Sequence, residues 1–158
     1  MGVGRGWPRD GMGAGMGGIA MASIVLADDD EDLRAVYAPC LRSAGHAVWE
    51  AAGGLEALEL VRRHRPALLV LDVWMPGVNG FEVLGQLRHD PAAAGLKVLM
   101  LSSMGDADTR LECFEMGAEE YLVKGVPLAD LRACVGRLVA DEARLFPRLE
   151  TEPEGPPP

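Results

Sequence analysis

The sequence predicts an α/β domain built on a doubly wound, five-stranded parallel sheet. Three observations predict this fold class. Short apolar runs alternate five times with longer segments of helical periodicity. The third run, Ala67–Leu71, is apolar throughout, which is typical of a parallel strand buried on both faces. Charged residues directly follow several runs, at the edge where open α/β sheets keep their binding sites.

Two strand–helix units form the first half of the domain. The run Ile24–Ala27 is the first strand, and apolar residues then recur at helical spacing over about 30–43. Pro39 lies inside this helix and should kink it or loosen a turn. A short strand at Ala47–Glu50 precedes a helix over 54–64. The helix positions expected to face inward are Leu33, Val36, Tyr37, Cys40, Leu41, Leu55, Leu58 and Val61.

Three further units complete the predicted sheet. The strand Ala67–Leu71 leads into a loop over 75–80 that is rich in glycine and proline. Gly117 ends the helix that precedes the last strand, and Pro127 suits the first turn of the final helix. The remaining elements are expected to be helices over 81–88, 106–116 and 127–140 and strands over 97–101 and 120–123.

Composition and charge narrow the classes of function. The chain has 158 residues and a formal net charge of −9, which argues against a nucleic-acid or anionic-membrane surface. No apolar run has the length of a transmembrane helix. The three cysteines are far apart without metal-ligand spacing, so we interpret them as buried or neutral thiols in a reducing cytosol. The histidines His46, His64 and His89 are expected to be exposed and non-catalytic.

The two ends of the chain differ from its middle. Residues 1–20 are rich in Gly and Met, and we expect them to be disordered or to be an upstream extension before a start at Met21. The G-x-G-x-x-G match at 13–18 precedes the first strand, whereas a dinucleotide loop must follow one. Residues 21–142 form the predicted domain. Residues 143–158 are acidic and proline-rich, and we expect a disordered tail.

Aspartates follow two strands of the predicted sheet. Asp28 and Asp29 end the first strand, and Asp72 ends the third. Like charges about 4 Å apart repel by roughly 1–4 kcal/mol per pair, so such a cluster indicates a divalent cation. Mg²⁺ suits it best because it is a hard ion that prefers oxygen ligands. Lys124 ends the fifth strand and should lie at the same edge.

Four motifs resemble the response-regulator receiver domains of two-component signalling, of the stand-alone type found in the chemotaxis regulator. They are the acidic pair, the loop Leu71–Gly80, the hydroxyl segment Leu101–Ser103 and the segment Gly117–Lys124. They stand in the family's order and spacing over about 23–140. The resemblance implies a flavodoxin-like (βα)5 fold.

The resemblance also implies a chemistry. Asp72 would be the phosphoacceptor, receiving a phosphoryl group from a histidine kinase or a histidine phosphotransfer protein. Asp28 and Asp29 would hold Mg²⁺, together with Asp72 and the backbone carbonyl of Trp74. Lys124 would pair with the phosphoryl oxygens.

Two further residues would couple the phosphoryl group to the surface. Ser102 would hydrogen-bond it, and Tyr121 would rotate inward as Ser102 moves. This coupling would change a protein-binding face on the fourth helix, fifth strand and fifth helix. The implied protein is a cytoplasmic single-domain response regulator, not an enzyme, acting as a monomer or a phosphorylation-dependent dimer without nucleic acid or membrane. The alternative is a pseudo-receiver, a phosphorylation-independent interaction module.

Three positions depart from the family pattern or modify it. Gly125 stands where the family usually has proline, often after a cis bond, and the sequence leaves the geometry of the Lys124–Gly125 bond open. The resemblance implies that Trp74 and Met104, two residues after Asp72 and Ser102, flank the path of the hydrolytic water. Both are bulky and neither has a carboxylate or amide to orient water, so we expect a long-lived phosphorylated state.

Each of these residues also has an ordinary structural interpretation. Asp28 and Asp29 could cap the first helix, and so could Asp30. The ordinary roles of the others are a turn residue for Asp72, a loop hydroxyl for Ser102, a solvated cation for Lys124 and aromatic packing for Tyr121. The shared order and spacing of the four motifs favour the functional interpretation.

Overall fold

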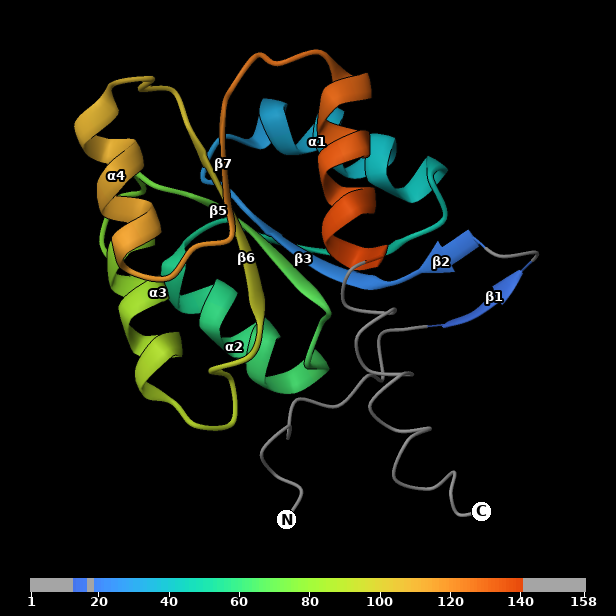
Figure 1. Cartoon of the computed structure of the whole chain (residues 1–158), viewed down its shortest axis with the longest axis horizontal. Helices are drawn as coiled ribbons and strands as arrows, with labels where there is room; N and C mark the ends of the chain where they lie inside the picture. Colours follow the sequence, from blue (N-terminus) through green and yellow to red (C-terminus); the bar gives the residue numbers. More distant parts are fainter. Residues whose placement is uncertain (1–12, 17–18, 141–158) are drawn as a thin grey trace.

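A five-stranded parallel sheet lies at the centre of the computed structural model, which describes residues 13–16 and 19–140 (Figure 1). The strand order is β4-β3-β5-β6-β7, and every neighbouring pair is parallel. The predicted fold class is therefore confirmed. The strands are β3 (Ser23–Ala27), β4 (Ala47–Ala51), β5 (Leu68–Asp72), β6 (Lys97–Ser102) and β7 (Glu120–Val123).

Helices cover both faces of the sheet and divide the core into two layers (Figure 1). The helices α2 (Gly54–His64), α3 (Gly80–His89) and α4 (Ala107–Glu115) pack on one face. The helix α1 (Glu31–Ser43) and a final helix over 128–140 pack on the other. Successive residues of β3 and β5 alternate between the two layers, so both strands are fully buried.

Side-chain caps fix where three of the helices begin. Asp30 accepts hydrogen bonds from the amides of Asp32 and Leu33 at the start of α1. Asn79 and Glu82 form a reciprocal capping box at the start of α3, and Asp106 caps α4. The helix α1 starts soon after the end of β3, and α3 starts after a longer loop but with Gly80 against the end of β5, so both helices begin at the edge of the sheet that carries the aspartates.

Two arginines, Arg88 and Arg42, bind parts of the sheet away from the aspartates: the amino ends of β6 and β7, and the outer strand β4. The Arg88 guanidinium donates to the carbonyls of Gly117 and Leu96 and pairs with Glu119 at 3.2 Å. Arg42 donates to the carbonyl of Val48 at 2.7 Å. Because β4 is an edge strand, this hydrogen bond satisfies a backbone carbonyl that has no neighbouring strand on that side.

The packing corrects several sequence predictions. Val36 and Leu55, which were expected to face inward, are 50% and 69% exposed. His46, which was expected to be exposed, is buried, and its Nδ1 accepts a hydrogen bond from the amide of Ala22 at 3.3 Å. Burial lowers the pKa of His46. Pro39 lies within α1, which continues through it as one helix.

Some predictions concern the borders of the domain. The strands β1 (Gly13–Met16) and β2 (Ile19–Met21) form an antiparallel pair within the segment for which the sequence predicts disorder or an upstream extension. Residues 1–12, 17–18 and 141–158, which include the predicted tail, lie outside the described residues, so the domain boundaries stay predictions. All three cysteines are buried and unpaired. Among the described residues, no helix has both the length and the apolar character needed to cross a membrane.

Candidate functional site

Asp28 and Asp29 occupy different environments at the end of β3. Asp28 is fully buried, and its amide donates to the Ala51 carbonyl at 3.0 Å, which extends the β3–β4 ladder by one residue. Its Oδ1 accepts from the Asp30 amide at 2.9 Å. Asp29 is exposed. Because Asp30 caps α1, the adjacent pair is left available for another role.

Asp72 ends the central strand β5 and is 1% exposed. The next amide, that of Val73, donates to the Leu101 carbonyl and keeps the β5–β6 ladder intact past the carboxylate. Gly80 packs against this strand end. A Cβ at Gly80 would lie 2.8 Å from the Val73 Cα and nearer still to the Asp72 carbonyl oxygen. Only glycine allows α3 to start this close to Asp72.

The three aspartates meet because β3 and β5 are neighbours with their carboxyl ends at the same edge. One carboxylate oxygen from each of Asp28, Asp29 and Asp72 lies within 4.8 Å of the others. Lys124 joins them, with its Nζ 2.9 Å from Asp28 Oδ2 and 3.0 Å from Asp72 Oδ1. The second oxygen of Asp72, Oδ2, is buried and has no hydrogen-bond partner among the described residues.

The electrostatics of this cluster centre on Asp72. Burial, followed by the charge of Asp28, raises the pKa of Asp72 to about 7, although the Lys124 ammonium opposes the rise. Burial acts to lower the pKa of Lys124, but its hydrogen bonds to Asp28 and Asp72 outweigh burial and raise that pKa. Lys124 therefore stays charged while Asp72 binds a proton near neutral pH.

The raised pKa predicts that the metal-free protein is destabilised by ionised Asp72. Because the folded form binds this proton more tightly than the unfolded form, the contribution of Asp72 to stability falls as pH rises from about 4 to 7 and levels off above 7. Asp72→Asn mimics the neutral form. Its stability advantage over wild type should grow across that pH range, reaching about 1–3 kcal/mol, below the roughly 4 kcal/mol that the whole shift represents.

Denaturant unfolding of both proteins at pH 5, 6, 7 and 8 in EDTA measures this difference. The difference has to increase with pH. A difference that is constant, or that shrinks toward pH 8, would show that Asp72 does not carry the raised pKa.

Ser102 and Tyr121 lie beside the carboxylate cluster. Ser102 is fully buried at the end of β6, and its Oγ accepts from the Met104 amide at 3.0 Å. The Ser102 carbonyl accepts from the Lys124 amide at 2.8 Å, which fixes the backbone of Lys124 against β6. Tyr121 is 3% exposed, and its hydroxyl donates to the Met104 carbonyl. The ring is thus already inward in the unmodified chain.

Trp74 and Met104 are both about half exposed, at 49% and 47%. The Trp74 ring meets Phe81 of α3 edge to face, with 5.5 Å between ring centroids. The bond before Gly125 is trans, and Gly125 has a φ of 94°, a conformation that favours glycine. The Gly125 amide donates to the Tyr37 hydroxyl at 3.2 Å.

Comparison with known proteins decides the family. The model of the response regulator receiver domain matches residues 24–136. The chain belongs to this family. The receiver domain is 32% identical over 125 residues to the DNA-binding dual master transcriptional regulator RpaA of Synechocystis, covering 79% of this chain and 52% of RpaA. It is 38% identical over 106 residues to the transcriptional regulatory protein AfsQ1 of Streptomyces coelicolor, covering 67% of this chain and 46% of AfsQ1. The chain spans about half the length of these relatives.

Solved structures agree with this family. A putative response regulator from Chloroflexus aurantiacus has a TM-score of 0.72 and 33% identity, covering 75% of this chain and 98% of that one. The chemotaxis protein CheY4 of Vibrio cholerae has a TM-score of 0.71 and 30% identity, covering 75% and 99%. The flavodoxin-like arrangement expected from the sequence is thus that of other receiver domains.

Sequence reasoning missed several residues that position the receiver-domain site. Arg34 donates to the Asp28 carbonyl at 2.6 Å and lies 3.4 Å from Glu50, so it holds the strand end that carries the acidic pair. Tyr37 was assigned only to packing, yet its hydroxyl anchors the loop after Lys124. No spacing rule signals such long-range contacts. Gly80 could have been suspected because it follows a capping Asn beside a strand end.

Proposed function

We propose that this receiver domain accepts a phosphoryl group on Asp72 and thereby switches a protein-binding face. One observation carries the proposal. Lys124 bridges Asp28 and Asp72, while Asp72 Oδ2 is buried without a hydrogen-bond partner among the described residues. A purely structural ion pair would leave no reason to bury the additional carboxylate oxygen, since an unsatisfied buried acceptor costs about 1–3 kcal/mol.

The donor set fits a hard divalent cation. Three carboxylates with one ammonium leave a net charge of −2 when all are ionised, and their oxygens are close enough to share an ion. Asp28, Asp29, Asp72 and the Trp74 carbonyl would hold Mg²⁺. When bound, Mg²⁺ offsets negative charge on the transferring phosphoryl group.

The residues proposed for the transfer lie together at one edge of the sheet. A carboxylate oxygen of Asp72 forms a bond to phosphorus as the phosphorus–nitrogen bond of a phosphohistidine breaks, and the electron pair stays on the imidazole of the donor protein. Lys124 is placed to pair with the phosphoryl oxygens, since its Nζ already lies 3.0 Å from Asp72. The Ser102 hydroxyl can donate to the phosphoryl group while it continues to accept from the Met104 amide. A histidine kinase or a histidine phosphotransfer protein would supply the group.

Output by protein contact fits the surface over α4, β7 and the final helix. This surface exposes one large apolar side chain from each element, Leu111, Val123 and Leu128. The net charge of −9 disfavours direct contact with DNA phosphates. Two relatives are named transcriptional regulators, and their additional length could carry a separate output function. We propose a cytoplasmic protein that is a monomer or a phosphorylation-dependent dimer.

The alternative, a pseudo-receiver that acts without phosphorylation, is favoured by one observation, the inward Tyr121 of the unmodified chain. Incubation with acetyl phosphate and Mg²⁺, followed by intact mass measurement, separates the two. A gain of one phosphoryl mass that EDTA prevents supports the proposed function. An unchanged mass with Mg²⁺ present would favour the pseudo-receiver.

Trp74 and Met104 are proposed to lengthen the life of the phosphorylated state. Neither side chain has a carboxylate or amide to orient a water molecule for in-line attack, and both are bulky. After the donor is removed, Trp74→Asn should lose its phosphoryl group faster than wild type, and Trp74→Asn with Met104→Glu faster still. A tenfold change corresponds to only about 1.4 kcal/mol of barrier.

Decay of the intact phosphorylated mass over time provides the measurement, with Phe81→Leu as a control that alters the Trp74 contact without adding a polar group. Equal or slower decay in both polar variants would show that these side chains do not shield the site.

A further inference from the structure

Tyr121 belongs to a continuous set of contacts that starts at Ser102. The Met104 amide donates to Ser102 Oγ at 3.0 Å, and the Met104 carbonyl accepts from the Tyr121 hydroxyl. The Tyr121 ring is buried in the layer between the sheet and the helices α2, α3 and α4. The loop from β6 to α4 is therefore held from both sides in the unmodified chain.

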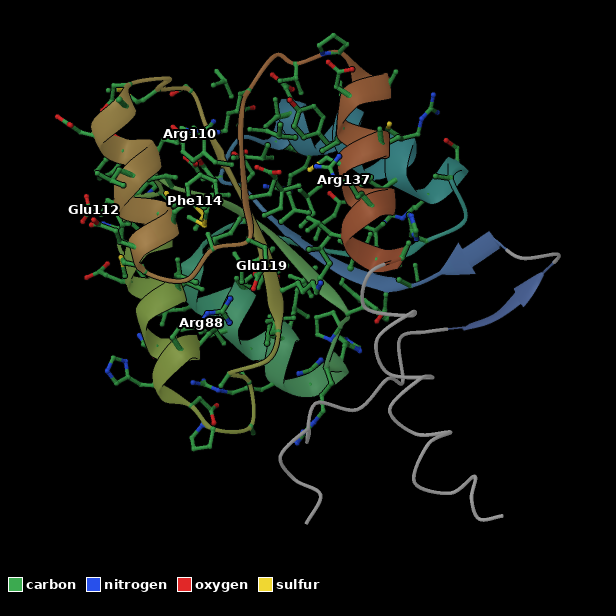
Figure 2. All side chains as sticks on the ribbon, in the orientation of Figure 1. Arg88, Arg110, Glu112, Phe114, Glu119 and Arg137 are labelled. Atoms are coloured by element: carbon green, nitrogen blue, oxygen red, sulfur yellow. The ribbon has the colours of Figure 1, made fainter. Side chains whose placement is uncertain are left out.

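Arg110 of α4 lies over the same ring. Its Cζ is 5.9 Å from the centroid of Tyr121 and 5.4 Å from that of Phe114, one helical turn along α4. Figure 2 shows Arg110 and Phe114 on the side of α4 that faces β7, with Glu112 on the opposite side. A guanidinium over the face of an aromatic ring is attracted by the ring quadrupole. No ion pair joins Arg110 to a carboxylate of the described residues, so the two rings are its defined partners.

We propose that Arg110 is a positioning residue that holds Tyr121 in its buried rotamer before any phosphoryl group arrives. The inference rests on the proposed function, because it concerns the face that phosphorylation of Asp72 would switch. An outward Tyr121 would lose its hydrogen bond to Met104, expose its ring to water and leave the Arg110 guanidinium. All three losses favour the buried rotamer.

The consequence is that Tyr121 on the switch face is already in its inward state before phosphorylation. A ligand or modification shifts an equilibrium only by the difference in its free energy between the two states. Because Arg110 already favours the inward state, phosphorylation has less left to change at Tyr121. A protein that recognises the face through Tyr121 would then bind the unmodified chain, and phosphorylation would raise its affinity only modestly.

The rotamer of Tyr121 can be measured without phosphorylation. The chain has two tyrosines, so ring-¹³C tyrosine gives two sets of NMR signals, and Tyr121→Phe assigns them. In EDTA and without a phosphoryl donor, a soluble paramagnetic probe should barely broaden the Tyr121 signals of wild type. In Arg110→Met, the population of the exposed Tyr121 rotamer should rise about fivefold, which is the effect of losing one exposed cation–π contact. The broadening of the Tyr121 signals should rise with that population. Arg110→Gln should behave in the same way and replaces Arg110→Met if that variant does not fold.

Two controls separate the contact from the loss of charge. Arg62→Met removes the same charge from an exposed position of α2 and should leave the Tyr121 signals unchanged. Arg110→Lys keeps the charge and should show broadening between wild type and Arg110→Met. Equal broadening in wild type and Arg110→Met, or an equal increase in Arg62→Met, would overturn the inference. Normal acetyl phosphate labelling of the same variants would leave the proposed function standing in that case.

Discussion

Asp72→Asn is expected to abolish labelling of the receiver domain by acetyl phosphate and Mg²⁺. Asn has nearly the same shape but lacks the anionic oxygen that would bond to phosphorus. The substitution should not unfold the chain. Burial raises the pKa of the Asp72 carboxyl to about 7, so the folded chain favours an uncharged side chain at this position. Intact mass measurement after incubation should show one added phosphoryl group in wild type and none in the variant.

The matched control for this experiment is Asp108→Asn. Asp108 is an exposed aspartate in the first turn of α4, so the variant makes the same chemical change far from the cluster. Its labelling should equal that of wild type. Labelling of Asp72→Asn that persists and is lost in acid and base would place the phosphoryl group on another carboxylate.

Gly80→Ala is expected to destabilise the domain by about 1–3 kcal/mol and to disturb the site. The added Cβ would meet backbone atoms of Asp72 and Val73, which cannot move aside as a flexible side chain would. Relief of this clash has to push α3 away from the end of β5. Denaturant unfolding should report the loss of stability, and acetyl phosphate labelling should be slower even where the variant is folded.

Gly136→Ala is the control for this substitution. Gly136 lies in the final helix, and a Cβ there would have no heavy atom within 4 Å. Alanine should stabilise that helix by about 0.5–1 kcal/mol and leave labelling unchanged. If Gly80→Ala were as stable as wild type, the close approach of α3 to β5 would not be what positions Asp72.

The strand ends were predictable from the sequence because their logic depends on the backbone alone. In a parallel sheet, residues that follow neighbouring strands share one edge whatever their side-chain rotamers. Because β3 and β5 are neighbours in the sheet, this rule brings Asp28, Asp29 and Asp72 to one place. It also places Lys124 on the same edge, where its long side chain reaches back from β7 to Asp28 and Asp72. The apolar part of β5, Leu68–Leu71, was equally clear, because burial on both faces favours an unbroken apolar run.

Features that depend on long side chains or local crowding were not predictable. Helical periodicity places Val36 and Leu55 on the apolar faces of their helices, but it does not show that no other element covers these two side chains. The buried His46 accepts a hydrogen bond from the amide of Ala22, a contact that only the folded chain reveals. The contacts of Arg34 and Arg110 likewise join elements whose spacing in sequence carries no signal.

Lys124, which bridges Asp28 and Asp72, competes with metal cations for the carboxylates of the site. The ammonium is a tethered counter-ion at a very high local concentration, and any ion from solution has to share the carboxylates with it. In the function proposed above, an incoming phosphoryl group would remove this competition, because it would offer Lys124 new oxygens to pair with. On that proposal, the Lys124 ammonium would weaken metal binding to the unmodified chain, and tight metal binding would require the phosphoryl group.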